Sequence, residues 1–259
     1  MIVNKYYTDF NFIDFISKYY VTPTYKDNEI VNVPFIPNKQ QKELIEKFLE
    51  NDYVVCKKSR QVGGTALIAT ILLTQVLVSN SGEHFYYVGL NKMMCDDMAR
   101  IISRFIKQLP LKLFNDITKP ILKVNNKSQI IFANNSAIHY VTLDSLDKSM
   151  IGISNIKTII LDEIAYAKPE TLLKKLYYIN NMSLYENFKI LTISTPTKTK
   201  ENELNVFKEL YNFASIKHSL YWWNDERYTE NLIWVKGDDI LYRKIQIILM
   251  NYMKMVGNQ

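Results

Sequence analysis

The stretch "CKKSRQVGGTA", residues 56–66, has most of what a phosphate-binding loop needs except a lysine in the usual place. The common pattern is G-x-x-x-x-G-K-[ST]: backbone N–H groups surround the phosphates, the lysine reaches the β and γ oxygens, and the hydroxyl holds Mg²⁺. Gly63 and Thr65 match it, but Gly64 occupies the lysine position and Lys58 the position of the first glycine. The stretch is therefore a loop whose lysine arrives from the other end, a broken loop, or a chance match.

The residues around this loop predict a strand, helix and strand in succession. An apolar run at 53–57 predicts a short strand, the long apolar run at 64–79 a helix, and "HFYYVG" at 84–89 a second strand. An amphipathic pattern at 92–108 predicts another helix, which stops before Pro110.

The same patterns continue along the chain. They predict a hairpin at 128–143 turning at Asn134 and Asn135, buried strands at 157–163 and 188–194 with a helix at 169–178 between them, and, less clearly, a strand at 213–223 and a helix at 238–255. Alternating strands and helices favour an α/β fold with a mostly parallel sheet and helices on both faces.

Composition excludes several classes of protein. The chain has 259 residues, 47% of them hydrophobic, which is enough for one large domain or two small ones. Two cysteines are too few for a disulfide framework and no apolar run could span a bilayer, so we expect an intracellular protein without a membrane segment. The net charge of +6 permits an anionic partner but equally fits a solvated surface. The three histidines are too scattered to predict a metal site.

A second candidate site is "TIILDEIAY" at 158–166, an apolar strand that ends in two carboxylates. In a parallel sheet this strand brings Asp162 and Glu163 to the carboxyl edge, where ligands of such folds bind. Asp162 is suited to hold Mg²⁺, directly or through water, and Glu163 to polarise the water that attacks a γ-phosphate. By itself the pair fits an ordinary acidic strand end, but its place downstream of a phosphate-type loop favours a functional role.

The chain contains, in order, "IPNKQQKELIEKFLENDYVVCKKSRQ", "KSRQVGGT", "FYYVGLNKMMCDDMARIISRFIKQLP", "IIFANNSAIHYVTL", "IILDEIAY" and "ILTISTPT". Together these segments resemble the ATPase domain of the large terminase subunit of tailed bacteriophages, over about residues 35–200. The resemblance implies a P-loop NTPase fold of the recombinase-like type, with an additional strand and a catalytic glutamate. It implies an ATPase core at 36–218, a small lid or linker subdomain made of 1–35 and 219–259, and ATP and Mg²⁺ as cofactors.

The resemblance also assigns roles to residues. Gln41, with Gln40 as the second candidate, would hold the adenine, and Ser194, Thr195 and Thr197 would sense the γ-phosphate and couple hydrolysis to movement. The implied nucleotide-binding residues are Gln41, Lys58, Ser59, Arg60, Gln61, Gly63, Gly64 and Thr65, the metal-binding ones Thr65 and Asp162, and the catalytic ones Glu163, Lys58 and Arg60.

The implied function is that of a motor domain that couples ATP hydrolysis to movement of double-stranded DNA into a procapsid. The implied partners are double-stranded DNA, contacted mainly at its phosphates, the portal of the procapsid, the small terminase subunit, and further copies of the chain in a ring. We expect an isolated chain to be monomeric and the working protein to be in the host cytoplasm, docked on the procapsid.

Two departures from the family stand out. Many members carry Arg-Gly shortly before the acidic strand, whereas this chain has Ile151 and Gly152, so the source of an arginine for catalysis is open. Members also continue into a nuclease domain of the RNase H type. This chain ends at Gln259, and we expect no nuclease activity from it.

Two lysines compete for the phosphates. A loop that wraps phosphate brings its first residue close to its last, so Lys58 can place its amine where the usual lysine lies. Lys57 is expected to point to the opposite face, because alternate strand residues face opposite ways. Arg60 is suited to contact phosphate, but a salt bridge to a carboxylate such as Glu163 is an equal alternative. Thr65 fits a metal and phosphate site at a helix start, or an ordinary helix position.

Two other classes of function remain open. A helicase-like translocase shares the glutamine, the loop and the Asp-Glu strand, but it needs a second domain with its own arginines. A non-catalytic nucleotide-binding or assembly module is compatible with the displaced lysine and the missing arginine. A phosphate-release assay with and without DNA separates an enzyme from a module.

Overall fold

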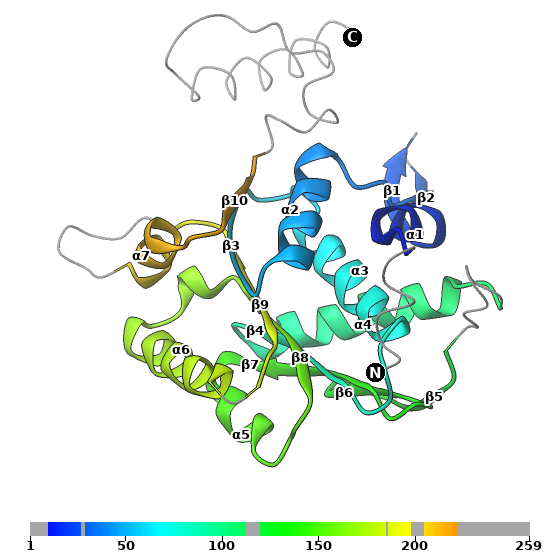
Figure 1. The fold of residues 1–259 in the computed structure, drawn as a ribbon. Helices are drawn as coiled ribbons and strands as arrows, with labels where there is room; N and C mark the ends of the chain where they lie inside the picture. The colour runs from blue at the N-terminus through cyan, green and yellow to red at the C-terminus, as the bar shows by residue number, and fades with distance from the viewer. Residues whose placement is uncertain (1–9, 27–28, 112–119, 185, 198–204, 222–259) are drawn as a thin grey trace, which may run out of the picture. The chain divides into compact units, whose positions relative to one another are not determined.

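A computed structural model of the chain describes residues 10–26, 29–111, 120–184, 186–197 and 205–221 (Figure 1). These residues lie in the first of two compact units, Met1–Glu226. The second unit, Arg227–Gln259, lies outside the described residues, and the helix predicted at 238–255 lies there with it.

One sheet of eight strands organises the described chain. Its strands are β3 (Tyr53–Lys58), β4 (His84–Gly89), β5 (Leu122–Asn125), β6 (Gln129–Phe132), β7 (Ala137–Thr142), β8 (Ile156–Asp162), β9 (Lys189–Ser194) and β10 (Lys217–Leu220). They are ordered β10-β3-β9-β8-β4-β7-β6-β5. The strands from β10 to β7 pair in parallel, and β6 and β5 add an antiparallel hairpin. The predicted mostly parallel sheet is confirmed, and β9 is the additional strand between the loop strand β3 and the acidic strand β8.

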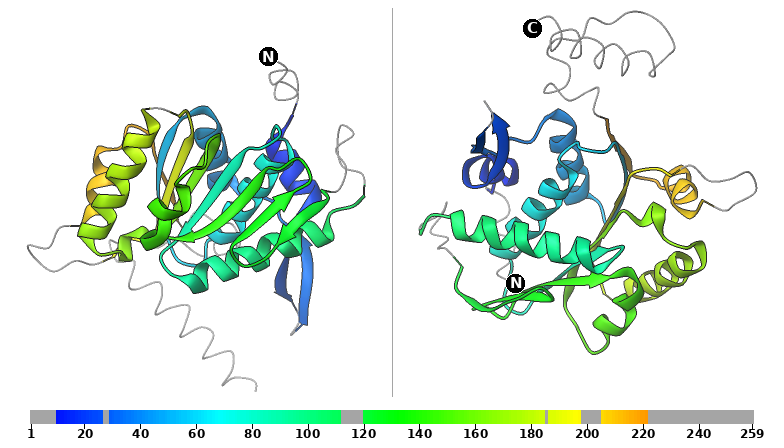
Figure 2. Two further views of the ribbon diagram at one scale, coloured as in Figure 1. Left: turned by 90° about the horizontal axis from the view of Figure 1, so that it is seen from below. Right: turned by 180° about the vertical axis from the view of Figure 1, so that it is seen from behind.

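Helices cover both faces of this sheet (Figures 1 and 2). One face carries α1 (Phe12–Tyr19), α2 (Lys39–Glu50), α3 (Gly64–Leu77) and α4 (Lys92–Gln108), and the other carries α5 (Leu146–Met150), α6 (Pro169–Ser183) and α7 (Val206–Phe213). The smaller elements are a separate hairpin, β1 (Val21–Lys26) with β2 (Glu29–Pro34), and two 3₁₀ turns, η2 (Leu143–Ser145) and η3 (Ile164–Tyr166).

Alternation along the central strands builds two cores. Val54 and Cys56 of β3 pack with α3 and α4, whereas Val55, between them, packs with α6 and α7. In β4, Tyr87 belongs to the first core and Tyr86 to the second. Such strands read as continuous apolar runs because both of their faces are buried. The helix α3 is apolar on nearly all sides for a related reason: it lies against the sheet and also contacts α1 and α4.

Local signals fix where helices begin. Asn38 caps α2 by accepting a hydrogen bond from the Gln41 N–H, while the Gln41 side chain accepts one from the Asn38 N–H. Asn91 caps α4 with one hydrogen bond, which its side chain accepts from the Met94 N–H. Pro169 stands in the first turn of α6. The starts of these helices therefore follow from residues readable in the sequence.

Several predicted boundaries change. The helix α6 extends to Ser183 rather than ending near residue 178, and the acidic strand ends at Asp162 because Glu163 takes a left-handed conformation with φ 57°. The predicted turn of the β6–β7 hairpin is confirmed, with Asn135 at φ 64°. Among the described residues, no helix is both long and apolar enough to cross a bilayer.

The grouping of 1–35 with 219–259 in one subdomain stays a prediction. Phe12, Phe15 and Ile16 of α1 belong to the same hydrophobic cluster as residues of α3. This part of the N-terminal region therefore packs into the core on the face of the sheet that α2, α3 and α4 cover. Residues 222–259 lie outside the described chain.

Candidate active site

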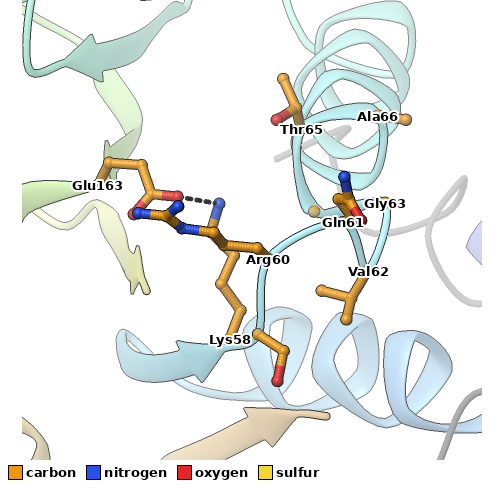
Figure 3. Close-up of a pocket in the computed structure, with 10 residues that line it drawn as sticks. Lys58, Arg60, Gln61, Val62, Gly63, Thr65, Ala66 and Glu163 are labelled. Carbon is orange, nitrogen blue, oxygen red and sulfur yellow. Dashed lines mark ion pairs between the residues drawn. The ribbon is translucent and has the colours of Figure 1, made fainter. Parts of the chain in front are cut away.

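The quoted loop turns from the end of β3 into the start of α3. Gln61 and Gly63 both have left-handed backbone angles, φ 63° and 72°, and they turn the chain sharply before Gly64 begins the helix. The Ser59 N–H donates to the carbonyl of Leu220 in β10, which anchors the first residue of the loop. Beside the loop lies a pocket of about 500 Å³ (Figure 3), lined by Lys58, Ser59, Arg60, Gln61, Val62, Gly63, Gly64, Thr65, Ala66 and Glu163.

Lys58 crosses this loop and reaches both acidic residues. Its side chain is buried, and its Nζ lies 2.7 Å from Oε1 of Glu163 (Figure 3). The same Nζ lies 3.4 Å from Oδ1 of Asp162. Burial would lower the pKa of the ammonium, but the two carboxylates outweigh burial and the pKa is raised. Lys58 therefore stays charged and neutralises the acidic pair.

Gly64 leaves the room that the Lys58 stem occupies. A Cβ placed on Gly64 would lie 3.0 Å from Cδ of Lys58 and 3.6 Å from its Nζ. The residue in the usual lysine position thus lies against the amine of the lysine from the other end of the loop. The two positions address the same space, which the sequence argument required of a relocated lysine.

Lys57 lies on the other face of β3, as the alternation of strand residues predicted. Its ammonium lies 4.7 Å from the ring centroid of Tyr211 in α7 and 5.6 Å from that of Tyr221. It does not line the pocket.

The two carboxylate oxygens of Asp162 contact different residues, Tyr87 and Lys58. Only 1% of the residue is exposed, and its Oδ2 accepts a hydrogen bond of 3.0 Å from the hydroxyl of Tyr87. Within the described chain, Oδ1 accepts no hydrogen bond and has only the ionic contact with Lys58. Burial raises the pKa of Asp162, and Lys58 opposes that shift.

Glu163 is held in a strained backbone conformation by contacts to the end of β9. A non-glycine residue with positive φ is uncommon and costs of the order of 1 kcal/mol or more. The Thr195 N–H donates to Oε2 at 2.9 Å, and the hydroxyls of Thr195 and Ser194 contact Oε1 and Oε2 at 3.1 and 3.2 Å. Burial would raise the pKa of Glu163, but Lys58 and these donors outweigh burial and lower it. Glu163 is therefore ionised at neutral pH and fixed in direction.

The predicted coupling residues connect this glutamate to η3. The Ala165 N–H donates to the Ser194 hydroxyl at 3.1 Å, and the Thr197 hydroxyl donates to the Ala165 carbonyl at 3.2 Å. The end of β9 and the residues after it, Ser194, Thr195 and Thr197, therefore hold residues 163–165, which follow β8. Their role in sensing a phosphate stays a prediction.

Arg60 and Thr65 occupy the rim and the far wall of the pocket. Arg60 is exposed and donates to the Tyr166 hydroxyl at 3.1 Å. Among the described residues, it forms no salt bridge with Glu163 or with any other carboxylate. Within that part of the chain the Thr65 hydroxyl takes part in no hydrogen bond. It stands in the first turn of α3, on the pocket wall (Figure 3).

The adenine candidates are both engaged within the protein. Gln41 is buried, and its amide donates to the Val62 carbonyl at 2.9 Å while its oxygen completes the α2 cap. Gln40 makes two hydrogen bonds, of 2.8 and 3.1 Å, with the main chain of Tyr221. Gln41 thus contacts the phosphate loop and Gln40 the end of β10, and adenine binding stays a prediction for Gln41.

The residues present fit Mg²⁺ only together with a phosphate ligand. Among the described residues, no group of three or more His, Cys, Asp and Glu side chains could hold a metal. A buried carboxylate oxygen without a hydrogen bond, on Asp162, and an unpaired hydroxyl, on Thr65, are nevertheless the oxygen donors that Mg²⁺ uses beside nucleotide phosphates.

The sequence did not identify two participants. Tyr87, which contacts Asp162, lies in an apolar run that predicts only a buried strand. Tyr166 follows the acidic pair and holds Arg60, but no pattern marks it. Ile151 is 75% exposed and follows α5, and it contributes nothing to the wall of the pocket.

No protein-family model and no curated protein matches this sequence. Solved structures of similar fold include the large terminase of bacteriophage HK97, at 16% identity and a TM-score of 0.53, over 71% of this chain and 37% of that one. They also include a mutant of the ATPase domain of the Thermus phage P74-26 large terminase, at 13% identity and a TM-score of 0.53, over 77% of this chain and 89% of that one. The chain thus spans little more than a third of the HK97 protein. It has the P-loop NTPase fold of large-terminase ATPase domains.

Proposed function

We propose that this chain is the ATP-hydrolysing motor domain of a viral DNA-packaging terminase, which moves double-stranded DNA into a procapsid. One observation carries the ATPase part of the proposal. Lys58 rises from the start of a phosphate-type loop and joins Asp162 and Glu163 at the carboxyl edge of the sheet, beside a pocket of about 500 Å³. A loop, a cation and two carboxylates then surround one space.

In this proposal Lys58 exchanges partners when ATP binds. The amine now neutralises two carboxylates, and the β and γ phosphates bring several negative charges to the same side of the loop. Movement of the ammonium toward the phosphates releases Oε1 of Glu163. That oxygen can then accept a hydrogen bond from the attacking water and take its proton as the reaction proceeds.

The hydrogen bonds from the end of β9 keep the Glu163 carboxylate in place while Lys58 moves. The contacts from Ser194 and Thr195 reach both carboxylate oxygens, so the loss of the lysine leaves the side chain held. A change in the position of Glu163 would pass through Ser194 to Ala165 and from there to Thr197. This path is the proposed coupling between hydrolysis and movement.

Thr65 and Asp162 would hold Mg²⁺, the second cofactor of the proposal. Bound there with the nucleotide, the ion would offset the negative charge of the phosphates. Within the described chain, the Thr65 hydroxyl takes part in no hydrogen bond, and Oδ1 of Asp162 has only the ionic contact with Lys58, so both can turn to the ion when Lys58 moves.

Ile151 supplies no arginine, so we expect turnover by an isolated chain to be slow. Arg60 stands at the rim of the pocket in the same chain, and a neighbouring copy in a ring is the other source of a cation for the transition state. The portal and the small terminase subunit belong to the same proposal, since a packaging motor works on a procapsid. The working site is then the host cytoplasm.

The test is phosphate release from ATP, with and without double-stranded DNA, at several protein concentrations. The expected result is slow, Mg²⁺-dependent release that rises with DNA and with protein concentration, against a Glu163→Gln blank. ATP binding without release above that blank would favour a non-catalytic nucleotide-binding module. Stimulation by single-stranded rather than double-stranded DNA would favour a helicase-like translocase. A fast rate independent of concentration would contradict the need for neighbouring copies.

A further inference from the structure

Tyr87 is a buried tyrosine whose hydroxyl lies at the acidic site although it lines no part of the pocket. It stands on β4, where it pairs with Ile160 of β8, two residues before Asp162. Its hydroxyl donates to Oδ2 of Asp162 at 3.0 Å. We propose that Tyr87 is a positioning residue for metal binding, which holds Asp162 so that its other oxygen faces the cation of the nucleotide complex.

The division of the carboxylate supports this role. Tyr87 donates to Oδ2, and the ammonium of Lys58, a residue that lines the pocket, lies 3.4 Å from Oδ1. A carboxylate held through one oxygen by a neutral donor keeps its charge and leaves the other oxygen for a ligand. Partners of this kind orient metal-binding side chains, and their loss lowers metal affinity.

The role becomes larger when ATP binds. In the structure both Lys58 and Tyr87 contact Asp162, which is 1% exposed. The proposed function moves the Lys58 amine to the phosphates, and this inference rests on that step. Within the described chain Tyr87 is then the remaining hydrogen-bond donor to a buried carboxylate, so its hydroxyl fixes the carboxylate while the cation arrives.

Close packing around the ring fixes where the hydroxyl lies. A Cβ on Gly89 would lie 3.2 Å from Cε1 of Tyr87, 3.3 Å from Sγ of Cys95 and 3.0 Å from Cβ of Met94. Gly89 therefore leaves the space between the end of β4 and α4 that the ring needs. The ring cannot shift toward α4 without meeting these atoms.

The experiment compares Tyr87→Phe with Tyr86→Phe in the full chain. Tyr86 is the matched control because it is the adjacent residue of the same strand, is equally buried, and donates its hydroxyl to the Ser149 carbonyl at 3.2 Å. Mn²⁺ serves as the probe, and its affinity is measured by electron paramagnetic resonance with a non-hydrolysable ATP analogue present. Nucleotide affinity without metal is measured separately in EDTA.

We expect Tyr87→Phe to weaken Mn²⁺ binding about tenfold and to leave the metal-free nucleotide affinity within twofold of the parent. Tyr86→Phe should change neither quantity. The Mg²⁺ concentration for half-maximal phosphate release should rise with Tyr87→Phe, while the rate at saturating Mg²⁺ changes much less. In an Asp162→Asn background, Tyr87→Phe should have no further effect on Mn²⁺ binding, because it acts through that carboxylate.

Equal Mn²⁺ affinity in Tyr87→Phe and Tyr86→Phe would overturn the inference and leave the proposed function intact, provided that the parent binds Mn²⁺ with nucleotide. A parent that binds no Mn²⁺ with nucleotide would overturn both. Should Tyr87→Phe fail to fold, Gly89→Ala takes its place, because the added methyl displaces the ring and keeps the hydroxyl. Unchanged Mn²⁺ affinity in that variant would then count against Tyr87.

Discussion

Each edge of the central sheet carries a partly or fully buried glutamate, and the two glutamates have different surroundings. Glu163 follows β8 at the carboxyl edge, in a left-handed conformation, and faces a pocket. Glu83 precedes β4 at the amino edge, where it is 8% exposed and accepts hydrogen bonds from the N–H and the side-chain amide of Asn80. Lys157 lies 3.8 Å from it.

The amino edge is closed by its own hydrogen bonds. Ser136 is fully buried, and its hydroxyl donates to the Asn80 carbonyl at 2.6 Å and accepts from the Glu83 N–H at 3.1 Å. His84 and His139 contact each other through ring nitrogens 2.9 Å apart. Asn80, Glu83 and Ser136 therefore bind one another, and so do His84 and His139.

The carboxyl edge is satisfied only by sharing. One lysine serves two carboxylates, Asp162 keeps an oxygen without a hydrogen bond, and the hydroxyl of Thr65 is unpaired within the described chain. Buried polar groups usually find partners, and Oδ1 of Asp162 is one of several buried side-chain atoms in the described chain that have no hydrogen bond. The carboxyl edge differs because the lysine beside this oxygen lines a pocket, where a ligand can complete the set.

The sharpest way to break this comparison is the same substitution at both edges. Glu163→Gln should lower the rate of phosphate release by at least about 100-fold with ATP binding kept, because an amide keeps the shape but cannot take the proton from water. Glu83→Gln should leave the rate unchanged and lower the melting temperature, because it removes a buried charge that Asn80 and Lys157 support. Single-turnover kinetics and thermal melting measure the two effects. A Glu163→Gln rate within about threefold of the parent would end the assignment of the catalytic carboxylate.

The next largest effect belongs to Lys58. Lys58→Ala should weaken ATP binding at least about tenfold, because the phosphates lose a cation from a buried site. Lys57→Ala should change binding little, because its ammonium lies against Tyr211 on the other face. Titration calorimetry with a non-hydrolysable ATP analogue and Mg²⁺ measures both. Parent-like binding by Lys58→Ala would shift the phosphate contact to Arg60 or favour the non-catalytic module.

Gly64→Lys sharpens that test because it restores the common loop pattern. In the parent the new side chain meets Cδ of Lys58 at 3.0 Å, so the single substitution should disturb the loop. In the Lys58→Ala background that obstacle is gone, and the new amine reaches the same space. Partial recovery of ATP binding in the double variant is the expected result. No recovery would mean that the two lysine positions do not address the same phosphate oxygens.

Much of the fold was predictable because its signals are local. The apolar strands, the Asn38 and Asn91 caps, Pro169 and the Asn135 turn each act within a few residues of their position in the sequence. Lys58 was identified because strand alternation and loop closure are geometric rules. The Tyr87 contact was not, since a tyrosine in a buried strand looks the same whether its hydroxyl donates to a backbone carbonyl, as in Tyr86, or to a buried carboxylate, as in Tyr87.

The contact between His84 and His139 was missed for the same reason. The two histidines are far apart in the sequence, and only the pairing of β4 with β7 brings them together. The left-handed turn at Glu163 also has no local signal, because it depends on donors from the end of β9. The sequence around a single residue does not predict its contacts with strands that are distant in the chain.

A smaller effect is expected from breaking the closed edge. Ser136→Ala removes the hydroxyl that joins Asn80 and Glu83, and leaving the buried Glu83 N–H without this acceptor should lower the free energy of unfolding by about 1–3 kcal/mol. Nucleotide affinity should not change. Ser103→Ala is the matched control, since its hydroxyl bonds to Asn125 at an exposed position and should cost less than about 0.5 kcal/mol. Urea unfolding measures the stability of both variants, and calorimetry measures their nucleotide affinity. A loss of nucleotide affinity in Ser136→Ala would show that the two edges are not independent.

The smallest effect is a pH dependence of stability at the same edge. Burial and, to a smaller extent, the charge of His84 lower the pKa of His139 to about 4. In the unfolded chain the pKa is about 6.5, so between these values the unfolded chain binds more protons than the folded one, and stability falls as the pH falls. From pH 7.5 to pH 5 the loss should be about 1–2 kcal/mol, and above pH 7.5 this group should contribute no slope. His139→Gln should flatten the dependence, although His84, whose pKa burial also lowers, keeps a part of it. Urea unfolding across this range, with parent and variant side by side, measures the difference. Identical slopes would show that His139 makes no contribution to the pH dependence of stability.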